Sequence, residues 1–484
     1  MPDRFEILHK DLAGRIGRLS TMHGTIETPA LMPVVNPHLP LIPPGELEKM
    51  GADMIITNSY IIHQDPALKI QAIERGLHDL LGFSGPIMTD SGAFQLSVYG
   101  DIDVSPLEIL NFQFAIKSDI SVPLDIPTPP DVTRERAQSE LKITEERLVQ
   151  AAALERSALL ACPIQGSTYP DLREKAGRFA RDLPFDVFPV GGVVPLMEAY
   201  RYSDLVDVVT AAKKGLGSGR PVHLFGAGHP MIFALAAAMG CDLFDSAAYA
   251  LYARQDRYLT VHGTGRLEEM SYLPCCCPVC QEHTSKELMD SPEKARLLAR
   301  HNLYVSLQEM KQVKESIREG SLWDLLETRC RSHPRMLDGL KRLSGQGQWL
   351  ESLDSASKST FFYTSPEAAR RPEVVRYARR IDRIVLQGNV LITDDSQADT
   401  SGFAHVLHFK PPFGPYPREL SETYPFNAEV PEEADDAAMN QAMKITKDLI
   451  RANPGAKFCF RLKNREMEER LRREQTIVGT IQGE

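Results

Sequence analysis

Three aspartates end short apolar segments, where a carboxylate could act on a substrate. Asp90 ends PIMTD, Asp125 ends SVPLD, and Asp245 ends CDLFD. A buried carboxylate without a partner is costly, so an acid in such a place usually has a partner or does chemistry. Carboxylates in different environments can divide the roles of nucleophile and general acid–base. The same acids could instead hold Mg²⁺.

A second group with chemical potential consists of cysteines. Cys275, Cys277 and Cys280 form a Cys-x-Cys-x-x-Cys knuckle, whose tight turn can direct three thiolates at one tetrahedral ion. His301 shares the apolar stripe of a predicted helix with Leu298, so we expect it to be the fourth ligand. Three thiolates and an imidazole predict one structural Zn²⁺ per chain.

Two features of this cysteine cluster leave alternatives open. His283 is closer in sequence and rivals His301 as the fourth ligand. Cys276 should point away from the other three thiols. Half of the eight cysteines lie in this cluster, which is unlike a dispersed disulfide framework and leaves a redox role as the lesser alternative.

The elements that must position these residues alternate between strand and helix. Short apolar runs predict eight strands, at 30–35, 53–58, 86–90, 121–125, 161–165, 187–192, 221–228 and 241–246. The segments between them have the 3.6-residue apolar spacing of amphipathic helices. Eight alternations within about 250 residues are typical of a (β/α)₈ TIM barrel. An open, doubly wound parallel sheet is the alternative.

In a barrel of this kind, the active site lies at the carboxyl ends of the strands. The residues at these ends are polar or glycine: Asn58, Asp90, Asp125, Gln165, Gly191, Gly192, Gly226 and Asp245. The three carboxylates should therefore converge at one mouth of the barrel.

The rest of the chain predicts smaller domains. We expect residues 1–350 to form the catalytic barrel, including a zinc-binding subdomain at about 270–350. Residues 351–430 predict a small α+β domain, with a polar linker around 344–360, and residues 431–484 predict a second, incomplete C-terminal domain. The latter contains a helix near 436–452 and a strand at KFCFRL.

Composition restricts location and partners. The 484 residues carry a formal net charge of −10, which does not favour nucleic-acid binding by overall electrostatics. Arginines cluster at 370–383, either as a phosphate-binding surface or as a solvated helix face. No sequence run is long and apolar enough to span a membrane, and no signal peptide is recognisable, so we expect a cytoplasmic protein without membrane contact.

Several motifs together resemble the tRNA-guanine transglycosylase family. They are TPALMPVV, MTDSGAFQLSVYG, CPIQGSTYPDLREK, FPVGGVVPLMEAYRY, LFDSAAYALYARQDRYLT, and CCCPVC with a distal RHNLYV. VPLDIPTPP and KPPFGPYPRELSETYPF resemble the archaeal, archaeosine-forming branch. The resemblance extends in order over about 1–425, with Ala93 where the family generally has glycine or serine.

The resemblance implies an exchange of bases in tRNA. Guanine at position 15 of the D-arm would be replaced by 7-cyano-7-deazaguanine (preQ0). Asp245 would be the nucleophile that attacks the ribose C1′ and forms a covalent intermediate. Asp90 would protonate the departing guanine and later deprotonate the incoming base.

The resemblance also implies which residues hold the base. Asp125 would accept hydrogen bonds from it, while Gln165 and the backbone N–H of Gly192 would meet its carbonyl. A second set would surround the ring and its 7-substituent: Phe94 over the face, with Val193 and Val194 beside the nitrile. Simple core packing is the alternative for that second set.

Family likeness raises further expectations and alternatives. Archaeal members commonly end in an RNA-binding PUA domain, which is not recognisable here, so we expect a separate PUA-domain protein to help. We also expect a homodimer. The alternatives are a queuine-type enzyme acting on the anticodon, a non-catalytic tRNA-binding subunit, and a zinc-dependent barrel hydrolase.

Overall fold

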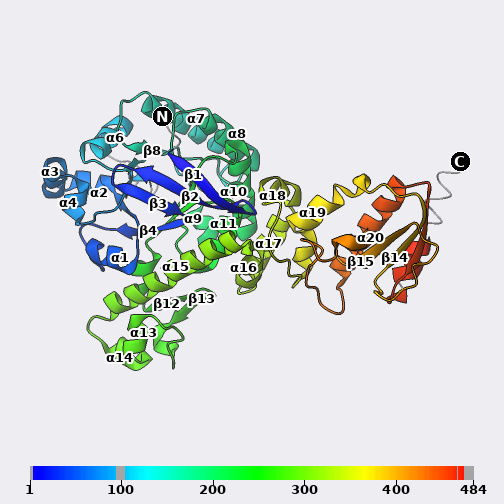
Figure 1. Ribbon diagram of the computed structural model, residues 1–484. Coiled ribbons are helices and arrows are strands. Elements are labelled where there is room, and N and C mark those ends of the chain that lie inside the picture. The colour runs from blue at the N-terminus through cyan, green and yellow to red at the C-terminus, as the bar shows by residue number, and fades with distance from the viewer. Residues whose placement is uncertain (1–3, 94–103, 466, 474–484) are drawn as a thin grey trace. The chain divides into compact units, whose positions relative to one another are not determined.

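The structure is a computed structural model that describes residues 4–93, 104–465 and 467–473. The chain divides into two compact units (Figure 1). The first comprises Met1–Arg318 and Leu325–Leu343, and the second comprises Glu319–Asp324 and Ser344–Glu484. Among the described residues, no helix is long and apolar enough to cross a membrane.

The first unit is built around eight parallel strands. They are β4 (Ala30–Val35), β5 (Ile55–Asn58), β6 (Ile87–Asp90), β7 (Ile120–Ser121), β8 (Leu159–Leu160), β9 (Phe188–Val190), β10 (Val222–Leu224) and β11 (Leu243–Ser246). Their order is β8-β7-β6-β5-β4-β11-β10-β9. Parallel bridges between Ala161 and Val187 and between Ile164 and Val190 join the two ends. The sheet is therefore a closed (β/α)₈ barrel, and the predicted fold class is confirmed.

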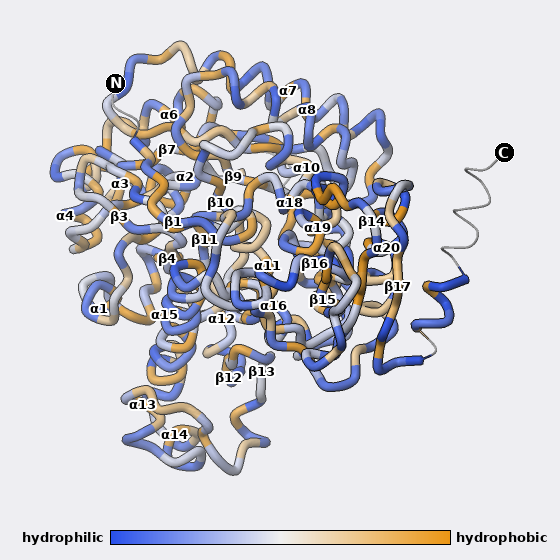
Figure 2. The backbone as a smooth tube through the Cα atoms, turned by 45° about the vertical axis from the view of Figure 1, so that its right-hand side comes forward, coloured by the Kyte–Doolittle hydropathy of each residue, from blue (hydrophilic) through white to orange (hydrophobic). Residues whose placement is uncertain are grey.

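Helices surround this barrel and alternate with its strands. They are α1 (Pro44–Met50), α2 (Ser59–Gln64), α3 (Pro66–Arg75), α4 (Leu77–Leu81), α6 (Pro106–Ala115), α7 (Arg134–Ala152), α8 (Pro170–Arg181), α9 (Val194–Glu198), α10 (Tyr202–Leu216), η1 (Pro230–Ile232), α11 (Phe233–Ala238) and α12 (Ala248–Ala253). Along α7 and α8, hydrophilic and hydrophobic residues alternate (Figure 2), as expected for helices with one face on the barrel.

A three-stranded antiparallel sheet precedes the barrel and was not predicted. It consists of β1 (Phe5–Asp11), β2 (Gly14–Thr21) and β3 (Gly24–Thr28). Leu19 and Ile26 are buried in the same core cluster as Met32, Met54 and Ile120 of the barrel region. This small sheet therefore contributes directly to the hydrophobic core of the barrel.

Asp242 lies at the amino end of β11 and pairs with the small sheet. Its two carboxylate oxygens accept hydrogen bonds from Nε and Nη2 of Arg15, both at 2.7 Å. Oδ2 also accepts the N–H of Val222 at 2.7 Å. Both members of the ion pair are buried, so removing one would leave an uncompensated charge. Asp242 is a structural acid, in contrast to Asp245 three residues later.

A subdomain follows the last barrel strand. The hairpin β12 (Arg257–Thr260) and β13 (Gly263–Arg266) leads through η2 (Leu267–Glu269) to α13 (Pro278–Glu282) and α14 (Ser285–Asp290). The long α15 (Lys294–Glu319) then runs from this subdomain alongside the barrel (Figure 1), followed by α16 (Leu322–Cys330) and α17 (Pro334–Ser344).

The second unit has a four-stranded sheet of its own. Its elements are α18 (Gly347–Leu353), η3 (Pro366–Arg370), α19 (Pro372–Ala378), η4 (Ile381–Arg383), β14 (Gly388–Thr393), β15 (His405–Lys410), β16 (Gly414–Pro417), η5 (Arg418–Leu420), α20 (Asp436–Ala452) and β17 (Ala456–Arg461). The strand order is β16-β15-β14-β17. β17 pairs with β14 and shares one core with it, so segments on both sides of residue 430 belong to the same sheet.

The segment expected to be a linker is instead folded. It contains α18 and Lys358, whose ammonium is buried within 3.0 Å of carboxylate oxygens of Asp354 and Glu373. Arginines of the 370–383 cluster are also used internally: Arg371 is buried and pairs with Glu373, and Arg376 pairs with Glu351. The sequence showed their charges but not their partners.

Candidate active site and metal centre

Asp90 lies at the carboxyl end of β6, held by the strand next to it. Asn58, the last residue of β5, is its register partner and donates from Nδ2 to Oδ2 of Asp90 at 3.2 Å. The other oxygen accepts the backbone N–H of Ser91 at 2.9 Å. Ser59 donates to the carbonyl of Asp90 at 2.7 Å. The carboxyl group is therefore fixed in orientation at the mouth of the barrel.

The surroundings of Asp90 change its acidity. Burial, followed by the negative charges of Asp125 and Asp245, raises the pKa of Asp90 to about 7. Asp125 and Asp245 therefore lie close enough for their charges to act on Asp90. A carboxyl group with a pKa near neutrality can both give and take a proton, as general acid–base chemistry requires.

Asp245 is the next-to-last residue of β11, and its Oδ1 has two neighbours. The Nε2 atom of His223, on β10, lies 2.9 Å away, and the backbone N–H of Gly226 donates to Oδ1 at 2.7 Å. His223 is fully buried, whereas the side chain of Asp245 is 13% exposed. Asp245 is thus anchored through one oxygen on a rigid strand end.

Asp125 and Gln165 form a buried polar pair in the same region of the barrel. Nε2 of Gln165 donates to Oδ2 of Asp125 at 2.6 Å. Burial raises the pKa of Asp125, although the Gln165 hydrogen bond and the charges of Arg147 and Arg173 oppose this rise. Among the described residues, Oε1 of Gln165 is buried without a hydrogen-bond partner. A buried unpaired acceptor of this kind is suited to meet a polar ligand.

The glycine pair after β9 allows this arrangement to form. A Cβ on Gly191 would lie 2.2 Å from Nε2 of Gln165. A Cβ on Gly192 would lie 2.8 Å from the Thr128 carbonyl oxygen, and the φ of Gly192 is +69°. Both positions therefore require glycine, because a side chain would displace Gln165 or strain the backbone.

The remaining residues predicted to surround the base are Val193, Val194 and Phe94. Val193 is fully buried. Val194 is partly exposed and packs against Gly226, where a Cβ would lie 2.3 Å from Val194 Cγ2. Phe94, predicted to cover the ring, lies outside the described residues. The roles of all three remain predictions.

Arg254 and Arg257 lie on either side of Asp256, shortly after Asp245 in the sequence. Asp256 pairs with Lys294, at 2.8 Å. Arg254 donates to the carbonyl of Leu39 at 3.2 Å. The guanidinium of Arg257 lies 4.0 Å from the ring centroid of Tyr252. The three charged side chains of this segment thus all have contacts within the protein.

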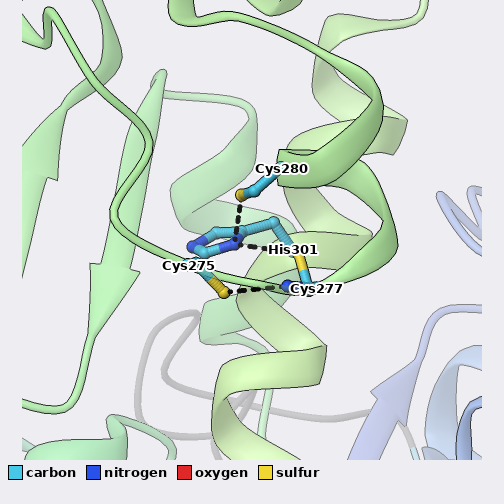
Figure 3. Close-up of side chains that lie close together, drawn as sticks. All are labelled: Cys275, Cys277, Cys280 and His301. Atoms are coloured by element: carbon cyan, nitrogen blue, oxygen red, sulfur yellow. Dashed lines mark hydrogen bonds between the residues drawn. The ribbon is translucent and has the colours of Figure 1, made fainter.

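The four predicted metal ligands converge in the subdomain (Figure 3). Cys275, Cys277, Cys280 and His301 each place one ligand atom within 4.8 Å of the others. Nδ1 of His301 lies 3.5 Å from Sγ of Cys277 and 3.3 Å from Sγ of Cys280. In a tetrahedral zinc site, with bonds of about 2.0 Å to nitrogen and 2.3 Å to sulfur, these atoms lie about 3.6 Å apart. The donor set therefore fits Zn²⁺.

The ring of His301 is oriented by its surroundings. Its Nε2 donates to the carbonyl of Leu259 at 3.0 Å, and the ring stacks on Tyr258 at a centroid distance of 3.6 Å. Nδ1 consequently faces the thiols, as a metal ligand needs. The rival ligand, His283, contacts the carbonyl of Val279 instead, and Cys276 is exposed.

Comparisons with known proteins identify the family. The model of the queuine tRNA-ribosyltransferase family matches residues 11–335. The chain belongs to this family. As a tRNA-ribosyltransferase family member it is a glycosyltransferase-type enzyme, and the matched region includes the entire barrel and the cysteine cluster.

Relatives within the family cover almost the whole chain. A protein of Methanosarcina barkeri is 57% identical over 457 residues, which are 94% of this chain and 93% of the relative. A protein of Haloferax volcanii is 54% identical (95% and 90%), and one of Archaeoglobus fulgidus is 48% identical (94% and 94%). All three are named tRNA-guanine(15) transglycosylase. The predicted resemblance to the archaeal branch is confirmed.

Sequence reasoning missed the residues that hold the carboxylates. It gave His223 no place in the transglycosylase site and identified Asn58 only as a polar strand end. The signal for Asn58 was its place opposite Asp90 at neighbouring strand ends. For His223, a polar residue in an otherwise apolar barrel strand was the available clue.

Proposed function

We propose that this chain is a tRNA-guanine(15) transglycosylase, which exchanges guanine at position 15 of tRNA for preQ0. The proposal rests on two carboxyl groups that lie at one end of the barrel. The pKa of Asp90 is raised to about 7, and Oδ1 of Asp245 is anchored by His223 and Gly226. The names of the relatives support the choice of substrate and position.

In the first half of the proposed reaction, Asp245 is the nucleophile. Its Oδ1 is engaged by His223 and Gly226, so Oδ2 is the oxygen that attacks C1′ of the ribose. The bond from C1′ to guanine breaks, and the departing base takes a proton from Asp90. The result is a covalent ester between the enzyme and the tRNA ribose.

The second half reverses these steps with a different base. Asp90, now ionised, removes a proton from preQ0, whose ring nitrogen attacks C1′. The bond between C1′ and Asp245 breaks, which restores the carboxylate. Two inversions at C1′ retain its configuration, as in a retaining glycosidase. Asp125, Gln165 and the N–H of Gly192 hold the base, and Val194 borders its nitrile.

The proposed zinc is structural. Cys275, Cys277, Cys280 and His301 would hold it, and it would fix the hairpin β12–β13 and α13 to α15. A four-ligand shell has no open position for a substrate. This argues against the zinc-dependent hydrolase that the sequence left open.

The decisive experiment is the exchange of radiolabelled preQ0 into tRNA. Substrates would be wild-type tRNA, tRNA altered at position 15, and tRNA altered in the anticodon. The proposal expects incorporation that is lost only with the change at position 15. Loss only with the anticodon change would establish the queuine-type reaction instead. Asp245→Ala should abolish incorporation while tRNA binding persists, and an active variant would contradict the nucleophile.

A further inference from the structure

A second cluster of metal-ligating side chains lies away from both sites described above. It contains His23, in the turn between β2 and β3, His78 on α4, and Asp119, which directly precedes β7. Their ligand atoms all lie within 4.8 Å of one another. Three segments that are far apart in the sequence thus bring two imidazoles and a carboxylate together.

The carboxylate of Asp119 is fixed before any ion is considered. Its side chain is fully buried. Oδ1 accepts the backbone N–H of His23 at 3.0 Å, and Oδ2 accepts the backbone N–H of Ile87 at 2.9 Å. These hydrogen bonds, with contacts from His78 and His23, outweigh burial and lower the pKa of Asp119, so it is an anion. A buried, oriented anion is a preformed cation ligand.

The two imidazoles approach this carboxylate from different elements. Nδ1 of His23 lies 2.9 Å from Oδ1, and Nε2 of His78 lies 3.0 Å from Oδ2. An ion held about 2.1 Å from each donor separates adjacent donors by about 3.0 Å in an octahedral shell and about 3.4 Å in a tetrahedral one. With both oxygens of Asp119 as ligands, the contacts of 2.9 and 3.0 Å match the edges of an octahedral shell.

The position of His78 adds a second, independent observation. Its Nε2 is buried, and among the described residues it has no well-aligned hydrogen bond, despite its closeness to Asp119. The imidazole rings of His23 and His78 stack with centroids 3.6 Å apart. A buried imidazole nitrogen beside a second imidazole and a carboxylate, without a proper hydrogen-bond partner, is suited to ligate a metal.

From this arrangement we propose a second metal site, in which His23, His78 and Asp119 bind a divalent transition ion such as Zn²⁺. Two histidines and one carboxylate are a ligand set that this class of ion accepts, with the remaining positions taken by water. The side chain of His23 is 34% exposed, which gives the ion a route from solvent.

The role of this ion follows from where its ligands lie. Asp119 precedes β7 and is therefore at the amino end of the barrel, whereas Asp90 and Asp245 lie at the carboxyl ends of β6 and β11. The ion joins the β2–β3 turn to α4 and the start of β7. It holds the small N-terminal sheet against the barrel, and it takes no part in base exchange.

The test counts metal in purified protein that has been equilibrated with Zn²⁺ and freed of excess. The proposal expects two equivalents per chain in the wild type. His78→Ala and His23→Ala should each retain one, and Cys277→Ala should also retain one. His38→Ala is the matched control and should retain two, because in the described part of the chain the ion pair of His38 is with one carboxylate, Asp65 at 3.8 Å.

Co²⁺ substitution distinguishes the two sites. In the Cys277→Ala background, Co²⁺ added to the histidine site should give visible bands without intense thiolate-to-metal charge transfer. Adding His23→Ala should remove those bands. One equivalent of zinc in the wild type, unchanged in both histidine variants, would overturn the proposal. Using two variants keeps the test valid if His78→Ala does not fold.

Discussion

His223 Nε2 lies 2.9 Å from Oδ1 of Asp245, and both side chains come from neighbouring parallel strands of the barrel. The imidazole is fully buried, so this contact is shielded from water. In the proposed reaction, it turns the carboxylate so that Oδ2 is the oxygen that attacks the ribose. We accordingly expect His223 to be a positioning residue, which would act on the substrate through Asp245.

His223→Ala should lower kcat for base exchange by about 10- to 100-fold, since small displacements of a reacting group have effects of this size. The KM for tRNA should change little, because His223 does not contact the tRNA in the proposed reaction. His223→Gln, which restores a hydrogen-bond donor, should recover part of the loss. A change confined to KM, or no recovery in the glutamine variant, would argue against positioning.

The pKa of Asp90, raised to about 7, predicts a pH profile. The first half of the reaction needs the protonated acid, so kcat/KM for tRNA should fall as the pH rises above about 7. Asp90→Asn should lose most exchange and remove that descending limb from any residual activity. A profile that is flat from pH 6 to 9 in the wild type would contradict the role of Asp90.

The same shift predicts a stability effect. The folded pKa of Asp90 exceeds its ordinary value of 3.8. Folding therefore favours the protonated form, and that contribution to stability is full below pH 3.8 and lost as the pH rises through about 7. Asp90→Asn should raise the free energy of unfolding relative to wild type more at pH 8 than at pH 5. Equal differences at both pH values would oppose this.

Gly192→Ala should weaken recognition of the base. The new methyl group would meet the Thr128 carbonyl at 2.8 Å and Gln165 Oε1 at 3.2 Å, at a φ that favours glycine. We expect the KM for preQ0 to rise by about 10-fold or more, since a displaced hydrogen bond in a binding site costs more than about 1 kcal/mol. Gly219→Ala, in open space, is the control. Equal KM values would show that Gly192 does not border the base.

Cys277→Ala should release the zinc of the cysteine cluster and destabilise the subdomain. Metal analysis should show a loss of about one equivalent, and the thermal transition should shift down. Cys276→Ala is a matched control, because that thiol is exposed and is not one of the four converging ligand residues. Equal metal content in the two variants would exclude the proposed coordination.

In the second unit, Arg371→Met should destabilise the fold. The guanidinium is fully buried and lies within 3.3 Å of carboxylate oxygens of Asp324 and Glu373. Removing one member of a buried network leaves uncompensated charge, at a cost of about 3–5 kcal/mol in the free energy of unfolding. Arg379→Ala, a 57% exposed side chain, should change it by less than about 1 kcal/mol. Chemical denaturation measures both.

The sequence was most informative where one short segment contained the whole signal. The cysteine knuckle needed only one distant partner, and the strands from residue 30 to residue 246 were visible as apolar runs ending in polar residues. The predicted positions of β7 and β8 were less accurate. The buried segments at these strands continue through prolines and polar residues, beyond the residues that form the hydrogen bonds of the sheet.

Other features depend on residues that only the fold brings together. The pairs of Asp242 with Arg15 and of His223 with Asp245 join positions 227 and 22 residues apart, respectively. The cluster of His23, His78 and Asp119 has no local spacing at all. The N-terminal sheet was not recognised, because the loop before Gly24 is short and polar residues alternate with apolar ones along the strands. Charge alone could not distinguish the buried Arg371 from exposed arginines.

The bridges that join β8 to β9 link folding to recognition of the base. Backbone hydrogen bonds from Ile164 to Pro189 and from Gly191 to Ile164 form this seam, directly beside Gln165 and Gly192. The groups that we expect to bind the purine base are therefore brought together only when β8 and β9 pair and close the barrel. We therefore expect a chain in which β8 and β9 are unpaired to lack activity altogether, without exchanging other bases in place of the correct one.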